Sequence, residues 1–124
     1  MLRRQLFATA LIAAAPVAHA AEPVGVLVTL RIRPGREAEF LDLLTSVLDA
    51  MRQEPTFITA SLHRDPADPL RFLLHEVWAD RTDLIEVQVK RSYRDAYWAR
   101  LSELLAAPRE VQEWRPMRTD GAIR

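Results

Sequence analysis

The stretch that decides the fold spans residues 62–80 and reads LHRDPADPLRFLLHEVWAD. Read with the residues just before it, this stretch predicts a strand over 57–65 and a returning strand over 71–78. Proline and aspartate fill the connection, residues 66–69, where such residues are typical of a tight turn. The middle of the chain is therefore expected to form an antiparallel hairpin.

Two further elements precede the hairpin. Residues 24–33 predict a strand, because valine, leucine and isoleucine alternate along one of its faces. The Pro34-Gly35 pair ends this strand, and residues 37–52 predict a helix. Its apolar positions have the spacing of one buried helix face. These positions are Phe40, Leu44, Val47, Leu48 and Met51.

The hairpin is followed by a helical region and a last strand. Asp80 is expected to cap the helical region, which extends to about residue 107 and bends near Ser92. Its second half has one apolar face, made of Tyr93, Tyr97, Leu101 and Leu104. Residues 109–117 predict a weak fourth strand at an edge of the sheet, since they include Pro116.

This order of elements, β-α-β-β-α-β, is the ferredoxin-like arrangement of the α+β class. It predicts an antiparallel four-stranded sheet with both helices on one face. The strand over 71–78 nevertheless has apolar residues on both sides, with Phe72 and Leu74 on one face and Leu73 and Val77 on the other. A second copy of the chain is the simplest cover for the open face, so we expect a homodimer.

The first twenty residues predict a cleavable export signal, and residues 21–124 form the domain. Arg3-Arg4 makes a basic start, and an apolar run over 6–17 is too short to span a bilayer comfortably. Ala18-His19-Ala20 fits the small-x-small rule for cleavage before Ala21. Either a twin-arginine or a general secretory route fits this pattern. We expect a periplasmic or secreted protein with no stable membrane span in its mature form.

Composition excludes several functions. The 17 basic and 17 acidic residues cancel, so nothing indicates nucleic-acid binding. The chain has no cysteine, which excludes disulfides, thiolate catalysis and iron–sulfur clusters. His63 and His75 lack a paired short spacing, and no metal site is predicted. His63 is instead expected to hold the hairpin turn with Asp65 or Asp68.

The phrase LHRD-x-x-DP-x-RF-x-L-x-E-x-W-A-D resembles the antibiotic biosynthesis monooxygenase family, and the resemblance extends over residues 24–108. It implies a dimeric α+β barrel. Members include small oxidoreductases that oxidise aromatic polyketides or quinols with oxygen and no bound cofactor. Other relatives degrade haem or isomerise a signalling sugar. We therefore expect no cofactor here.

Three residues are candidates for the site. The resemblance places Trp78, in the E-x-W motif, beside the pocket as its wall. His75 is the candidate base, because an imidazole moves protons near neutral pH, and Tyr93 is the candidate hydrogen-bond donor. Two of them have a structural alternative: Trp78 as a core aromatic with a partner for its indole N–H, and His75 as a hydrogen-bonded inward residue. Glu76 is either an ion-pair partner of an arginine across the dimer or a general base.

The second helical region departs from the family. Relatives often read A-H-x-x-(T/S)-P-H-x-x-x-(Y/F), whereas this chain has Gln88 and Tyr93 at the histidine positions and keeps Tyr97. The missing imidazoles weigh against haem degradation. Two functions remain open. One is an exported, cofactor-independent monooxygenase acting on a small aromatic or quinol. The alternative is a non-catalytic dimer that binds a small hydrophobic or aromatic ligand.

Overall fold

The computed structural model describes residues 20–121. The predicted export signal lies outside the described residues except for Ala20, so it stays a prediction. The strands are β1 (Val24–Arg31), β2 (Phe57–Asp65), β3 (Asp68–Trp78) and β4 (Glu110–Trp114). The helices are α2 (Glu37–Met51), α3 (Arg81–Glu86) and α4 (Asp95–Leu104), with the 3₁₀ turns η1 (Gln88–Lys90) and η2 (Ser92–Arg94) between the last two.

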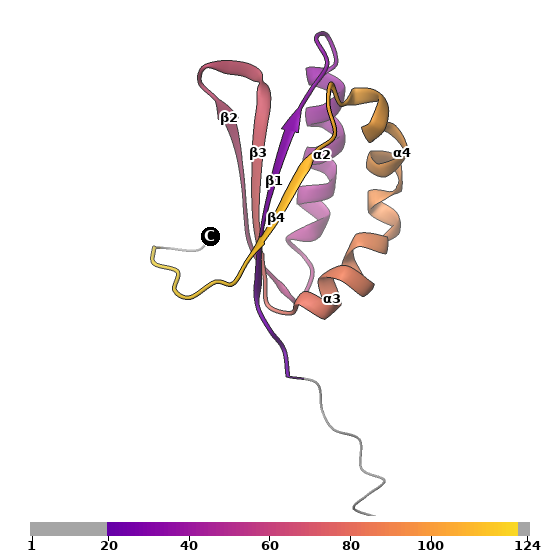
Figure 1. Cartoon of the computed structure of the whole chain (residues 1–124). Helices are drawn as coiled ribbons and strands as arrows, with labels where there is room; N and C mark the ends of the chain where they lie inside the picture. The colour runs from indigo at the N-terminus through magenta and orange to yellow at the C-terminus, as the bar shows by residue number, and fades with distance from the viewer. Residues whose placement is uncertain (1–19, 122–124) are drawn as a thin grey trace, which may run out of the picture.

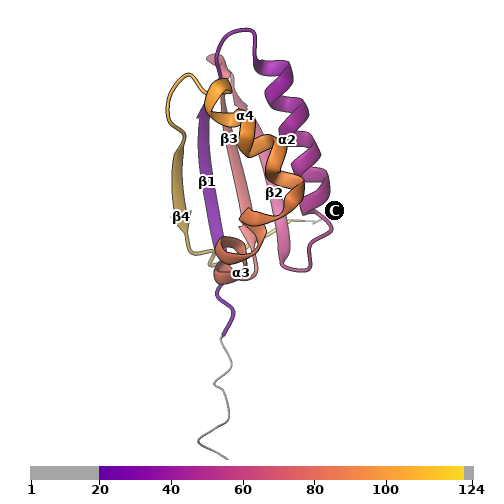
Figure 2. The same ribbon diagram turned by 90° about the vertical axis from the view of Figure 1, so that its right-hand side faces the viewer.

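The four strands form one sheet in the order β2-β3-β1-β4, and all the pairs are antiparallel. The helices lie on one face of this sheet (Figures 1 and 2). The predicted ferredoxin-like α+β fold is therefore confirmed. As expected, β4 is an edge strand, but it ends before Pro116, which cannot donate a ladder hydrogen bond.

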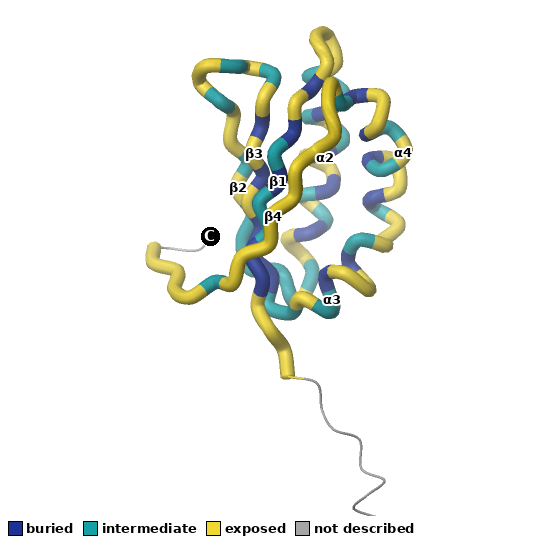
Figure 3. Tube along the Cα trace, viewed as in Figure 1, coloured by how far each residue is buried: buried dark blue, intermediate teal, exposed yellow. Residues whose placement is uncertain are grey.

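The core lies between the sheet and the helices. Alternate residues of β3, from Phe72 to Trp78, point toward the helix layer and are buried. Phe40 of α2 packs on Phe72 with ring centroids 5.1 Å apart. Figure 3 shows buried positions on β1, β3 and the inner sides of the helices, whereas β4 is exposed. The strand and helix periodicities therefore predict most of the core, whereas Val26, Leu48 and Tyr93 are only partly buried.

Two aspartates hold the hairpin turn. The Oδ1 atom of Asp65 accepts a hydrogen bond from the Ala67 N–H at 2.8 Å, and Asp68 Oδ1 accepts one from the Leu70 N–H at 3.1 Å. The Ala67 N–H also holds the pKa of Asp65 below its usual value. This turn lets β3 begin at Asp68, three residues earlier than predicted. Among the described residues, His63 makes no hydrogen bond to either aspartate.

The helical region is broken where a bend was predicted. Asp80 caps α3 by accepting hydrogen bonds from the backbone N–H groups of Thr82 and Asp83. Arg91 then has extended backbone angles, φ −60° and ψ 138°, and α4 follows. The helix ends at Leu104 and not near residue 107, because Leu105 leaves the helix and bridges to Ile32 beside β1.

Among the described residues, no helix covers the opposite face of the sheet, and only the segment after β4 passes beside one end of it (Figure 1). It includes His75, which is exposed, and Leu73, which is 37% exposed. Trp114 of β4 pairs with Gly25 of β1 and is 60% exposed. We call this surface the open face. No helix in the described part of the chain is long and apolar enough to cross a membrane.

Candidate active site

Trp78 and Glu76 form a buried pair at the end of β3. The Trp78 side chain is fully buried, and its ring meets that of Phe57 edge-on at 5.5 Å. Its Nε1–H donates a 2.9 Å hydrogen bond to Oε1 of Glu76, which is itself only 8% exposed. Trp78 thus has the partner that a buried indole needs. It also holds the Glu76 carboxylate in one orientation.

Glu76 faces a cavity between the sheet and the helices, which we call the inter-layer cavity. Its outer part has a volume of about 160 Å³ and extends to the exposed side chains of Ile85 and Val111. A deeper part of about 30 Å³ shares several lining residues with it. The shared residues are Val28, Glu76, Arg94, Trp98 and Arg109. The other walls of the outer part are mostly apolar.

Two arginines line the same cavity. Arg94 is only 5% exposed, and its Nε and Nη2 atoms are the only buried side-chain polar atoms among the described residues without a hydrogen-bond partner. Arg109 lies over the Trp98 ring, with its Cζ 5.2 Å from the centroid. Within residues 20–121 no ion pair joins Glu76 to either arginine. The expected pairing of Glu76 with an arginine across the dimer stays a prediction.

The phenol of Tyr97 lies at the inner end of the cavity. Burial raises the pKa of Tyr97 to about 12, against the opposing charge of Arg109, and the Glu76 carboxylate adds to the increase. The Tyr97 hydroxyl is therefore neutral at ordinary pH. It can act as a hydrogen-bond donor but not as a base.

Tyr93 belongs to a polar network outside this cavity. Its hydroxyl donates to Glu54 Oε2 at 3.1 Å and lies 3.4 Å from Gln88 Oε1. Gln88 donates in turn to Asp83 at 3.1 Å, and Arg91 donates to Glu54 at 2.8 Å. Burial raises the pKa of Tyr93. Gln88 and Tyr93 thus join the segment after α2 to the helical region.

His75 lies on the open face, away from the other two candidates. Strand alternation directs its side chain opposite to Glu76 and Trp78, and it pairs with Leu27 and Ser61 on the neighbouring strands. The protomer does not bring His75, Trp78 and Tyr93 into a single pocket, because the sheet separates His75 from the helix side. The catalytic role of each residue stays a prediction.

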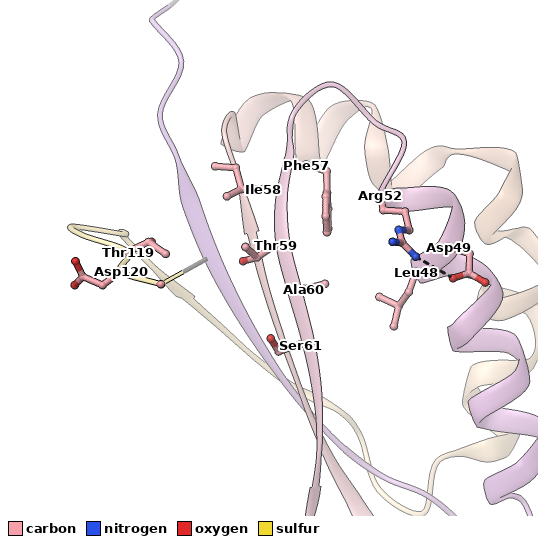
Figure 4. A pocket seen from close by; sticks show the side chains of 11 residues that line it. Leu48, Asp49, Arg52, Phe57, Ile58, Thr59, Ala60, Ser61, Thr119 and Asp120 are labelled. Carbon is pink, nitrogen blue, oxygen red and sulfur yellow. Dashed lines mark ion pairs between the residues drawn. The ribbon is translucent and has the colours of Figure 1, made fainter. Parts of the chain in front are cut away.

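In the other two hollows, the arginines and aspartates that line the walls form ion pairs. A groove of about 510 Å³ passes around the edge strand β2. Figure 4 shows Phe57 and Ala60 pointing toward α2, whereas Ile58 and Thr59 point away from it. A second groove, of about 430 Å³, lies beside the hairpin turn. Within residues 20–121, no cluster of three or more histidine, aspartate or glutamate side chains could hold a metal ion.

Comparison with known proteins identifies the family. Residues 23–96 match the antibiotic biosynthesis monooxygenase family. The chain belongs to this family. It is 35% identical over 95 residues, 76% of this chain and 79% of the relative, to a protein of Pestalotiopsis microspora named as a candidate monooxygenase. It is also 27% identical over 99 residues to an uncharacterised protein of Synechocystis, covering 80% of this chain and 67% of the relative.

Solved structures share the antibiotic biosynthesis monooxygenase fold. A candidate family member from Nitrosomonas europaea superposes with a TM-score of 0.74 at 15% identity, covering 85% of this chain and 100% of that one. A second candidate family member, from Caulobacter crescentus, superposes with a TM-score of 0.72 at 19% identity, covering 79% of this chain and 92% of that one. At these identities the likeness concerns the fold alone.

Three residues of the cavity in this family member were not predicted from the sequence. They are Arg94, Trp98 and Arg109. A signal for Arg94 was present, because it lies three residues before Tyr97 and seven before Leu101, on the same helical face. A charged residue on such a face is informative, because arginine is rarely buried without a partner. The expected face began instead with Tyr93, whose hydroxyl turns to Glu54.

Proposed function

We propose that this protein is an exported, homodimeric oxidoreductase that oxygenates a small aromatic or quinol without a bound cofactor. The chemistry takes place in the inter-layer cavity. One observation carries the proposal: a buried carboxylate, Glu76, and a buried guanidinium, Arg94, face the same small, mostly apolar cavity without forming an ion pair. Membership of the family supports the reaction class.

The size of the cavity supports a ligand with one ring. An engineered protein cavity of about 150 Å³ binds benzene, and the outer part here has about 160 Å³. The apolar walls suit the ring, and the polar groups would orient its substituents. A polycyclic substrate would extend beyond this volume.

Glu76 is the base in this proposal. Its carboxylate accepts the proton of a ring hydroxyl, and the positive charge of Arg94 stabilises the anion that results. Electron density on the ring carbon then attacks O₂. For a hydroquinone, one oxygen atom replaces a ring hydrogen and the other leaves as water. The organic product is the hydroxyquinone, so the substrate loses four electrons and O₂ gains four.

Oxygen uptake with a panel of single-ring quinols tests this function, with products identified by mass spectrometry. Glu76→Gln keeps the shape and an acceptor for Trp78 but removes the base. Uptake should fall by about 10²–10⁴-fold. His75→Ala is the matched comparison on the other face of the sheet and should change uptake little. A large loss in His75→Ala with normal uptake in Glu76→Gln would overturn the assignment to Glu76 and restore His75 as base.

A non-catalytic ligand-binding dimer is the second candidate. One observation favours it: the histidine positions of relatives are occupied by Gln88 and Tyr93, which are engaged in hydrogen bonds with each other and with acidic residues. This function predicts that the protein binds single-ring phenols tightly and consumes no oxygen with any quinol of the panel.

A further inference from the structure

We infer that the inter-layer cavity binds a single-ring aromatic acid, with Arg94 holding the carboxylate and Glu76 facing a ring hydroxyl. The inference rests on the proposed function in placing the ligand in this cavity. It goes further in assigning the ligand a negative charge before any reaction occurs.

The charges around the cavity do not balance. Glu76 is opposed by two arginines, Arg94 and Arg109. A second carboxylate at the rim, Glu113, is already bound by Arg81, whose Nε lies 2.5 Å from Glu113 Oε1 and whose Nη2 lies 3.2 Å from Oε2. One positive charge therefore faces the cavity without an anionic partner.

Arg94 is the group that would bind the acid. A buried N–H without a partner is costly, and a buried guanidinium more so. Its Nε and Nη2 atoms are the ones without partners, and an arginine N–H pair of this kind matches the two oxygens of a carboxylate. Tyr93 lies beside Arg94, with its ring 5.7 Å from Cζ and its hydroxyl donating to Glu54, but it leaves Nε and Nη2 without an acceptor.

The rest of the cavity suits an aromatic ring with a hydroxyl. Trp98 and Val28 line both parts of the cavity and supply apolar surface. The Glu76 carboxylate accepts only the Trp78 hydrogen bond among the described residues, so it can accept another from a ligand hydroxyl. Because Glu76 would repel a second carboxylate, the acid group is directed to the Arg94 side.

Paired probes test the charge. We would measure binding of 2,5-dihydroxybenzoate and of its neutral amide, 2,5-dihydroxybenzamide, by anaerobic calorimetry with the protein lacking residues 1–20 and with the full chain. The two probes have nearly the same shape. A charge-assisted hydrogen bond predicts about 10-fold or tighter binding of the acid. Equal binding of the two probes, or no binding of either, would overturn the inference.

Variants locate the effect. Arg94→Met should abolish the preference for the acid, whereas Arg36→Met, an exposed arginine outside the cavity, should leave it intact. Arg109 is exposed, so the Arg109→Gln variant should fold normally. It should lose less of the preference for the acid than Arg94→Met does. A preference that survives Arg94→Met would contradict the assigned site. Oxygen uptake is measured separately, so that the two hypotheses can fail independently. Binding of the acid without oxygen uptake would contradict only the proposed reaction. Oxygen uptake together with equal binding of the two probes would contradict only this inference.

Discussion

At the residue scale, Arg94 is expected to favour ligand binding while lowering the stability of the ligand-free protein. Its buried guanidinium lacks partners at Nε and Nη2 in the ligand-free protein. Arg94→Met fills similar space without a charge, so the free energy of unfolding should rise by about 1–3 kcal/mol. Urea denaturation of the ligand-free protein measures this change in the free energy of unfolding, and Arg36→Met is the control. A loss of stability in Arg94→Met would mean that the guanidinium is well satisfied in solution.

Tyr97 gives a pH dependence at the same scale. Its folded pKa of about 12 lies above the ordinary value of 10.0, so the folded state keeps the phenolic proton longer than the unfolded state does. The stabilising contribution is complete below pH 10 and is lost as pH rises from 10 to 12. At pH 11 the loss is about 1.4 kcal/mol.

Comparing unfolding at pH 8 and pH 11 isolates this contribution. Tyr97→Phe keeps the ring but removes the titrating group. The variant should therefore lose about 1.4 kcal/mol less than the wild type between these two pH values. Equal losses in both proteins would show that Tyr97 does not have a raised pKa.

At the scale of elements, Tyr93 links the end of α2 to the segment between α3 and α4. Tyr93→Phe removes the hydrogen bond to Glu54 and should lower the free energy of unfolding by about 0.5–1.5 kcal/mol. Oxygen uptake per folded molecule should stay unchanged, because Tyr93 does not line the inter-layer cavity. Combining it with Glu54→Gln should give less than additive losses. A selective loss of uptake would return Tyr93 to the catalytic residues.

At the scale of the whole molecule, the open face predicts a homodimer. The chain from Ala21 should sediment at twice the monomer mass at micromolar concentration. Leu73→Asp places a charge on the open face and should shift the protein to monomer. Val87→Asp is a matched control on the helix side, since Val87 is 39% exposed and Leu73 37%. A wild-type monomer would rule out the barrel.

Export is the other prediction at this scale. Protein recovered from the periplasm should begin at Ala21, as measured by intact mass. Replacing Arg3 and Arg4 together by lysine should block export by a twin-arginine route and leave a general secretory route working. Recovery of the uncleaved chain in the cytosol alone would contradict both routes.

The sequence by itself determined the hairpin, the ferredoxin-like order and the buried faces. These features depend on local patterns, such as the alternation along residues 71–78, the helical spacing from Phe40 to Met51 and the capping Asp80. The same alternation placed Glu76 and Trp78 together and His75 opposite them. Sequence reasoning could therefore foresee part of the site, namely the E-x-W pair.

Only the tertiary structure decided which distant groups share the cavity. Glu76 comes from β3, Arg94 from η2, Trp98 from α4 and Arg109 from the segment before β4. No periodicity relates these positions, because their proximity follows from how the helix layer packs on the sheet. The extended backbone at Arg91 interrupts the helix and precedes the turn in which Arg94, and not Tyr93, is buried. Local patterns specify faces, whereas packing between layers specifies which side chains meet.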